Sequence, residues 1–208
     1  MGKFTTTEFD KKLLETYDYV LGIDEVGRGC IAGDIVACGF LVSRTNIDKL
    51  NERVADSKTL SAKRRELVAP QLAEEFQHWV AARNAQFINA HGIGKANIEI
   101  FEDIIKAAKE FVEERSATLK IVVDGTDGRS PKDTLTLPKA ESTSTAVAAA
   151  SIVAKQSRDK AMEALHAQHP NYGFDAHKGY GTAQHKQALI AHGLLPEHRT
   201  LFTRTFLR

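Results

Sequence analysis

The chain has little cysteine and no long apolar run. Its two cysteines, Cys30 and Cys38, lie eight positions apart within one predicted loop-and-strand segment. We therefore expect no structural disulfide and a reducing, cytoplasmic setting. No apolar run approaches the roughly 20 residues of a membrane-spanning helix, and Met1 to Thr5 lack the apolar core of a secretion signal. No repeat or Pro/Gly/Ser linker divides the 208 residues, which predicts a single domain.

An excess of charge of one sign is also absent. The 28 Lys and Arg residues oppose 27 Asp and Glu residues, so the net charge is +1. This balance neither indicates nor excludes a nucleic-acid partner. Residues 155–208 differ, because they hold eight basic and four acidic residues and six of the eight histidines. Such a basic quarter could meet phosphates, and a solvated basic surface explains the same composition equally well.

Apolar patterning predicts strands and helices that alternate after an opening hairpin. Predicted strands cover residues 19–24, 35–42, 78–82 and 120–125, and predicted helices cover 61–76, 97–115, 143–165 and 182–191. This order predicts an α/β layer architecture, in which a mixed sheet carries helices on its faces.

Two of the predicted strands end in carboxylates, Asp24-Glu25 and Asp124. Open α/β sheets place their sites at strand carboxyl ends, so neighbouring strands would bring these groups together. Such a cluster repels itself unless a cation joins it, and oxygen-only ligands favour Mg²⁺ or Mn²⁺ over Zn²⁺. Glu141, just before the Ala-rich helix, could reach the same cluster. Each residue alone is more often a cap or a turn former, but their combination favours a metal site.

A glycine-rich turn, Gly27-Arg28-Gly29, follows the first predicted strand. Glycines let a backbone approach a ligand closely, and an Arg can fork onto a phosphate. A plain hairpin turn with a surface Arg is the alternative. A dinucleotide site is weaker, because the spacing to Gly33 breaks the G-x-G-x-x-G pattern and a strand is predicted to follow.

The motifs occur in an order that resembles the ribonuclease HII family. They are Ile23–Gly29 with Ala32-Gly33, Asp56–Ser61, Val123–Gly125, Ala149–Lys155 with Arg158-Asp159, His177–Thr182 and His198-Arg199. Chance could produce any one of these matches but hardly the ordered set. Arg28 and the short N-terminus favour this family over the related ribonuclease HIII type, which usually has Gly-Thr-Gly in the turn and an extra N-terminal domain.

The resemblance implies an RNase H-like fold, a mixed five-stranded sheet flanked by helices, with a helical C-terminal extension. It implies one domain over residues 1–208, with a catalytic core at about 18–165 and a substrate-binding helical region at about 166–208. By motif position it also implies that four carboxylates bind metal and are catalytic. These are Asp24, Glu25, Asp124 and Glu141.

The resemblance further implies how the ribose is recognised. Gly27, Arg28 and Gly29 match a loop that reads the 2′-hydroxyl of a ribonucleotide through backbone groups. Tyr180 matches a tyrosine that stacks on the following sugar, although a half-buried core tyrosine is its alternative. Contact with the 2′-hydroxyl is what distinguishes RNA from DNA, which makes these roles chemically reasonable.

Basic side chains are the candidates for phosphate contacts. Ser57 and Lys58 match a segment near the substrate phosphates, and Lys178 could neutralise phosphate. Solvated surface charge is the alternative for both lysines. We do not expect His177 and His185 to bind metal, because an oxygen-rich site is available and a basic groove would explain them.

The implied activity is that of a metal-dependent endoribonuclease. It would hydrolyse the RNA strand of RNA–DNA hybrids and nick 5′ to single ribonucleotides in duplex DNA, leaving 3′-hydroxyl and 5′-phosphate ends. Two divalent ions, Mg²⁺ or Mn²⁺, would take part. A hybrid-binding protein without catalysis is the alternative, which the intact carboxylate set disfavours. We expect a cytoplasmic monomer acting in ribonucleotide excision repair and DNA replication, and a contact of its C-terminal tail with a sliding clamp stays open.

Three residues depart from the family pattern. Cys30 and Asp34 stand where proline is common, and Leu201 stands where serine is common. The stiffness of the glycine-rich turn and the contacts of the tail are therefore in question, whereas the carboxylates are not.

Overall fold

The computed structural model describes residues 6–55, 62–125 and 131–204. Its five-stranded sheet has the order β3-β2-β1-β4-β5. The strands are β1 Tyr19–Val26, β2 Ile35–Ser43, β3 His78–Arg83, β4 Leu119–Asp124 and β5 Leu135–Leu137. β1 and β3 each pair with β2 in antiparallel orientation, whereas β4 is parallel to both β1 and β5. The predicted mixed sheet is confirmed.

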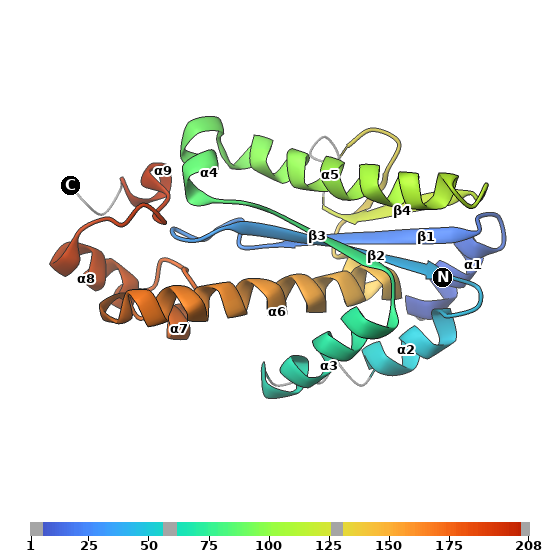
Figure 1. The fold of residues 1–208 in the computed structure, drawn as a ribbon, viewed down its shortest axis with the longest axis horizontal. Coiled ribbons are helices and arrows are strands. Elements are labelled where there is room, and N and C mark those ends of the chain that lie inside the picture. The colour runs from blue at the N-terminus through green and yellow to red at the C-terminus, as the bar shows by residue number, and fades with distance from the viewer. Residues whose placement is uncertain (1–5, 56–61, 126–130, 205–208) are drawn as a thin grey trace.

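Helices cover both faces of the sheet (Figure 1). α5 lies on one face, and α6 lies on the other together with α2 and α3. A group of short helices lies beyond the end of the sheet that is opposite α1. The helices are α1 Thr6–Leu14, α2 Ile47–Ala55, α3 Ala62–Glu75, α4 Ala85–His91, α5 Ile93–Glu113, α6 Thr145–Gln168, α7 Phe174–His177, α8 Ala183–His192 and α9 Thr200–Thr203, with 3-10 turns η1 Ala140–Ser142 and η2 Pro170–Tyr172.

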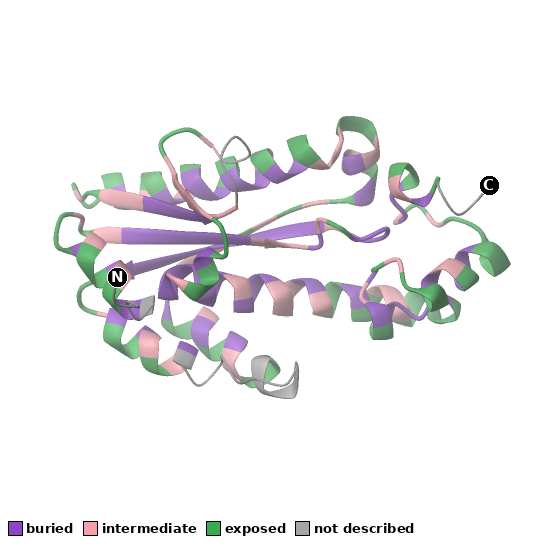
Figure 2. Cartoon of the chain, turned by 180° about the vertical axis from the view of Figure 1, so that it is seen from behind, coloured by how far each residue is buried: buried purple, intermediate pink, exposed green. Residues whose placement is uncertain are grey.

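The central strands are buried on both faces (Figure 2). Alternate residues of β1 enter different cores, because successive side chains of a strand point to opposite faces. Val20 packs with α6, whereas Leu21 and Ile23 pack with α5. The Ala-rich start of α6 lies so close to β1 that a Cβ at Gly22 would be 2.3 Å from the Val147 nitrogen. Gly22 on the strand and Ala146 on the helix are small, and they therefore let the helix approach the strand.

A third cluster joins the C-terminal extension, residues 169–204, to the rest of the chain. It combines Tyr172, Phe174 and Leu189 of the extension with Ile31 and Met162. An isolated antiparallel bridge also joins Ala32 to His198.

The eight elements predicted from sequence are present with shifted ends. The largest shift is at α5, which begins at Ile93 rather than Asn97. Short or less periodic elements escaped prediction: α1, α2, α4, β5, α7 and α9. Cys30 and Cys38 are both buried, and neither forms a disulfide within the described residues. Within the described part of the chain, no helix has the length and apolarity needed to cross a membrane.

Candidate active site

Two aspartates lie side by side where the parallel pairing of β1 with β4 ends. Ile23 of β1 is paired with Val123 of β4, so Asp24 and Asp124 follow at equivalent positions. Asp24 is only 9% exposed. Its pKa is raised to about 7, chiefly by burial and also by the negative charges of Asp124 and Glu25, while a hydrogen bond from Ser151 opposes the rise. The topology therefore brings the two predicted aspartates together.

Glu25 is held beside the same pair. Burial raises its pKa, and Arg28 opposes this rise. The Arg28 Nη1 atom lies 3.4 Å from the Glu25 Oε1 atom. This contact joins the glycine-rich turn to the carboxylates and occupies Arg28 with a carboxylate of its own chain.

Glu141 is placed by the segment that follows β5. The Ala140 N–H donates to Asp124 Oδ1 at 2.7 Å, which ties η1 to the end of β4. Glu141 is the next residue, and its side chain is exposed to solvent. Over residues 6–55, 62–125 and 131–204, no three Asp, Glu, His or Cys side chains are gathered closely enough to hold a metal ion. The structure thus brings Asp24, Glu25 and Asp124 into electrostatic contact but leaves Glu141 at the rim.

The chemistry of this cluster suits a hard cation. The donors are carboxylate oxygens, which Mg²⁺ and Mn²⁺ prefer. The raised pKa values of Asp24 and Glu25 reflect burial and mutual repulsion. A divalent ion would favour the charged forms and so lower both pKa values.

The glycine loop, residues 27–34, leads from β1 into β2. Gly27 is buried with φ of +90°, whereas Gly29 is exposed and a Cβ there would meet no atom within 4 Å. A strand rather than a helix follows the loop, which removes the dinucleotide-site alternative. The exposed backbone at Gly29 can be approached closely by a ligand.

The tyrosine loop, residues 178–182, lies directly against the glycine loop. The Ile31 N–H donates to Gly179 O at 2.9 Å. Tyr180 is 43% exposed, and burial and the neighbouring Cys30 raise the pKa of its hydroxyl. The predicted sugar-reading elements are therefore adjacent, although about 150 residues separate them in the sequence.

The remaining phosphate candidates have different positions. The Lys178 ammonium lies 2.6 Å from Glu163 Oε1, so it is paired within the protein. Ser57 and Lys58 lie outside the described residues. Their proposed roles stay predictions.

The interpretation of His177 and His185 as part of a basic groove is wrong. Both rings are buried and stacked, with centroids 4.1 Å apart. Burial lowers both pKa values, that of His185 to about 4. They are therefore neutral core residues at neutral pH.

Several basic side chains of the C-terminal quarter are buried or paired and do not form an open basic surface. Arg158 and Arg199 are completely buried, and their guanidinium groups donate to backbone carbonyls. Lys155 is paired with Asp159 at 2.6 Å, as Lys178 is with Glu163. Both arginines belong to the motifs identified in the sequence, but their role could not be predicted there, because a short motif does not show which Arg is buried.

Two of the departures from the family pattern lie in the glycine loop. The Cys30 N–H donates to Gly27 O at 3.3 Å, a bond that proline could not make. Asp34 contributes its carbonyl oxygen to Arg158, which proline would also offer. Leu201, the third departure, is 43% exposed on α9. The loop is therefore held by backbone contacts that these replacements preserve or add to.

Comparison with known proteins agrees with this geometry. Curated proteins named Ribonuclease HII from Chlorobaculum parvum and Acholeplasma laidlawii are 38% and 36% identical to the chain. The first match covers 95% of both chains, and the second covers 93% of this chain and 92% of the relative.

Solved structures share the fold. Ribonuclease H2 from Pyrococcus horikoshii OT3 has a TM-score of 0.67 and 24% identity, covering 90% of this chain and 96% of that one. RNase HII of Archaeoglobus fulgidus, solved with PCNA, has a TM-score of 0.66 and 25% identity, covering 86% of this chain and 93% of that one. Bst-RNase HIII, solved with Mn²⁺, has a TM-score of 0.71 and 22% identity, covering 93% of this chain and 71% of that one. The family model described as Ribonuclease HII matches residues 21–207, and the chain therefore belongs to the ribonuclease HII family of endonucleases.

Proposed function

We propose that the chain hydrolyses the RNA strand of RNA–DNA hybrids and nicks duplex DNA on the 5′ side of single ribonucleotides. The products would be 3′-hydroxyl and 5′-phosphate ends. Family membership supports the activity on hybrids. The observation that carries the finer proposal is the pair Asp24 and Asp124, joined through β1 to a glycine loop that lies against Tyr180.

The proposed metal ligands are Asp24, Glu25, Asp124 and Glu141. Two bound Mg²⁺ or Mn²⁺ ions would supply an activated water and stabilise negative charge on the leaving 3′-oxygen. The Mn²⁺ in the Bst-RNase HIII structure belongs to that protein and agrees with an oxygen-ligand site here. The protein itself would hold the carboxylates together where β1 and β4 stop pairing, and burial there would keep competing water away from Asp24.

Selection of RNA over DNA requires contact with a 2′-hydroxyl, which both donates and accepts hydrogen bonds. We propose that the backbone of Gly27, Arg28 and Gly29 makes this contact. Tyr180 would offer its exposed ring to the neighbouring sugar. Lys178 could reach a phosphate only by leaving Glu163. Ser57 and Lys58 keep their proposed phosphate role on the resemblance alone.

A role in ribonucleotide excision repair and replication follows from this substrate. The Archaeoglobus relative was solved in complex with PCNA, which supports a sliding clamp as a proposed partner of this chain. The proposed contact segment is the C-terminal tail, whose last four residues lie outside the described part. A cytoplasmic monomer remains our proposal for location and assembly.

The direct test uses labelled DNA duplexes that carry one ribonucleotide, none, or a continuous RNA strand, each with Mg²⁺, Mn²⁺ or EDTA. A metal-dependent nick 5′ to the single ribonucleotide, with no cleavage of all-DNA duplex, is the expected result. Cleavage of the continuous RNA strand alone would refute the junction activity but keep the ribonuclease. Binding without cleavage would favour the hybrid-binding alternative.

A further inference from the structure

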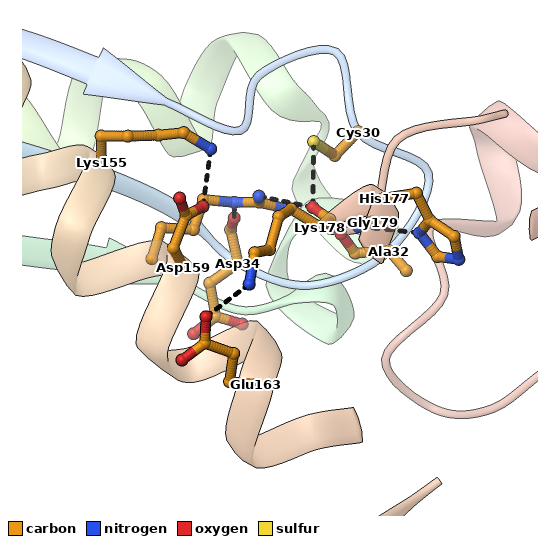
Figure 3. A network of polar contacts seen from close by, with 10 residues as sticks. Cys30, Ala32, Asp34, Lys155, Asp159, Glu163, His177, Lys178 and Gly179 are labelled. Carbon is orange, nitrogen blue, oxygen red and sulfur yellow. Dashed lines mark hydrogen bonds and ion pairs between the residues drawn. The ribbon is translucent and has the colours of Figure 1, made fainter. Parts of the chain in front are cut away.

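Arg158 of α6 connects the two loops that the proposed function uses. Its side chain is completely buried, and no carboxylate of the described residues forms an ion pair with it. Instead Nε donates to Asp34 O at 2.9 Å, Nη2 to Ala32 O at 3.1 Å and Nη1 to Lys178 O at 2.7 Å. Figure 3 shows Ala32, Asp34 and Lys178 close to one another. One guanidinium thus bonds the glycine loop and the tyrosine loop together.

Three glycines with positive φ make room for this guanidinium. They are Gly27, Gly33 and Gly179, with φ of +90°, +78° and +83°. A Cβ at Gly27 would lie 2.2 Å from Arg158 Nε, and a Cβ at Gly179 would lie 2.4 Å from Ala32 O. Such distances are shorter than real side chains allow, so the close approach of both loops to Arg158 depends on glycine. Gly27 therefore serves the Arg158 contact as well as its proposed contact with the sugar.

Arg199 provides a contrast on the same loop. Its guanidinium is also buried and donates only to carbonyls of the glycine loop. The acceptors are Gly27, Arg28, Cys30 and Gly33, at 2.7 to 3.1 Å. Arg199 thus shapes one loop, whereas Arg158 sets how far that loop lies from the tyrosine loop.

A buried guanidinium without a carboxylate is costly unless dipoles satisfy it. The three carbonyls around Arg158 belong to two separate segments, and the planar guanidinium donates to them from three different nitrogens. Lysine carries the same charge but has a single nitrogen, so it would lose contact with at least one segment. The geometry therefore indicates that Arg158 sets the distance between the glycine loop and the tyrosine loop and does not only supply a charge.

We propose that Arg158 is a positioning residue for substrate selection. It holds the backbone of Gly27-Arg28-Gly29 and the ring of Tyr180 at the separation of a ribose and the next sugar. This inference rests on the proposed function. A single ribonucleotide can bind productively in only one position, whereas a continuous RNA strand offers many. Cleavage at a single ribonucleotide should therefore be more sensitive to this separation than cleavage of a continuous RNA strand.

The central variant is Arg158→Lys, assayed for kcat and KM on the single-ribonucleotide duplex and on the continuous hybrid. We expect kcat/KM on the single-ribonucleotide duplex to fall about 100-fold, because misplacement by about 1 Å costs that much, with a clearly smaller loss on the hybrid. In a double-mutant cycle with Tyr180→Ala, the Arg158→Lys loss should shrink to about 10-fold or less. The Mn²⁺-dependent rise in Tm should match that of the wild type.

Two further variants separate positioning from stability. Leu50→Ala removes a buried side chain of α2. This helix lies at the end of the sheet that is opposite the short C-terminal helices (Figure 1). The substitution should lower Tm but leave the preference between the two substrates unchanged. Gly179→Ala keeps Arg158 but pushes the tyrosine loop away from Ala32, and it should reproduce the selective loss even if Arg158→Lys does not fold.

The outcomes are distinguishable. If the wild type does not cut the single-ribonucleotide duplex, the proposed function fails and this inference fails with it. If the wild type cuts that duplex but Arg158→Lys or Gly179→Ala loses both substrates equally, or no more than Leu50→Ala, the inference alone is overturned.

Discussion

The protonation of Asp24 is set by its burial and by its carboxylate neighbours. Its pKa of about 7 means that much of the population carries a proton at neutral pH without a cation. A protonated carboxyl is a poor metal ligand, so metal binding and proton release are coupled. A charged Asp24 without a cation thus lowers the stability of the fold, whereas with a bound cation the same charge contributes to metal affinity.

We predict that Asp24→Asn lowers kcat at least about a thousandfold, corresponding to roughly 4 kcal/mol of lost transition-state stabilisation. The fold should stay intact, because the amide fills the same volume without charge. Cleavage assays and far-UV circular dichroism check both parts. Addition of Mn²⁺ should raise the wild-type Tm more than that of the variant. Full turnover by Asp24→Asn would refute the assignment.

At the scale of elements, a buried carboxyl group of α1 is hydrogen-bonded to the start of α6. Asp10 is completely buried, and its Oδ2 accepts the Ala146 N–H at 3.0 Å, at the start of α6. Burial raises the pKa of Asp10 to about 6, against opposing hydrogen bonds from residues 144–146. The native state therefore holds this proton more tightly than the unfolded chain does.

The sign of the pH effect of Asp10 follows from this. Its contribution to stability is fully present below about pH 4 and is lost as pH rises through about 6. Asp10→Asn stays neutral, so at pH 8 it should be more stable than the wild type by up to about 3 kcal/mol, and nearly equal at pH 4. Urea unfolding at pH 4, 6 and 8 measures this, with cleavage activity at pH 8 as the control. A difference that does not change with pH would contradict it.

The C-terminal extension contains three buried histidines whose protons are determined by neighbouring groups. The Gly179 N–H donates to His177 Nδ1 at 3.2 Å, and the Leu195 N–H donates to His198 Nδ1 at 2.8 Å. His177 and His198 must therefore carry their proton on Nε2. His198 Nε2 lies 3.1 Å from His185 Nε2, so His185 carries its proton on Nδ1, which donates to Tyr180 O at 2.9 Å.

We predict that nitrogen-15 NMR at pH 7 finds the Nε2–H tautomer for His177 and His198 and the Nδ1–H tautomer for His185. A second proton on any ring would set two donors face to face, which agrees with the lowered pKa values of all three. For His185 the contribution to stability is present above about pH 6.5 and lost as pH falls through about 4. This is opposite in sign to the effect of Asp10. A charged His185 ring at pH 6 would disprove the arrangement.

For the whole molecule, the C-terminal extension and the sheet are joined by contacts of several kinds. They share the apolar cluster around Ile31 and Met162, and the Gly33 N–H donates to Glu197 O at 2.9 Å. Arg158 and Arg199 add buried hydrogen bonds across the same boundary. These contacts favour one folding unit rather than two.

We predict a single cooperative unfolding transition, with coincident midpoints from circular dichroism and from the fluorescence of Trp79, which lies in the sheet. Trp79 is the only tryptophan in the chain, so fluorescence reports on the sheet alone. NMR signals of the buried histidines should be lost at the same urea concentration. Earlier loss of the histidine signals would show that the extension unfolds separately.

The sequence alone determined the α/β class and the long elements, and it placed two of the proposed ligands after predicted strands. Periodic apolar residues mark α5 and a continuous apolar run marks β1, and Asp24 and Asp124 each follow a recognisable apolar run. Short elements such as β5 and α9 carry too few residues for a period to show. Tertiary structure alone decided that Arg158 and Arg199 lie inside, that His177 and His185 are neutral, and that Lys178 is paired. Burial and partnership depend on which distant segments meet, and local patterning does not contain that information.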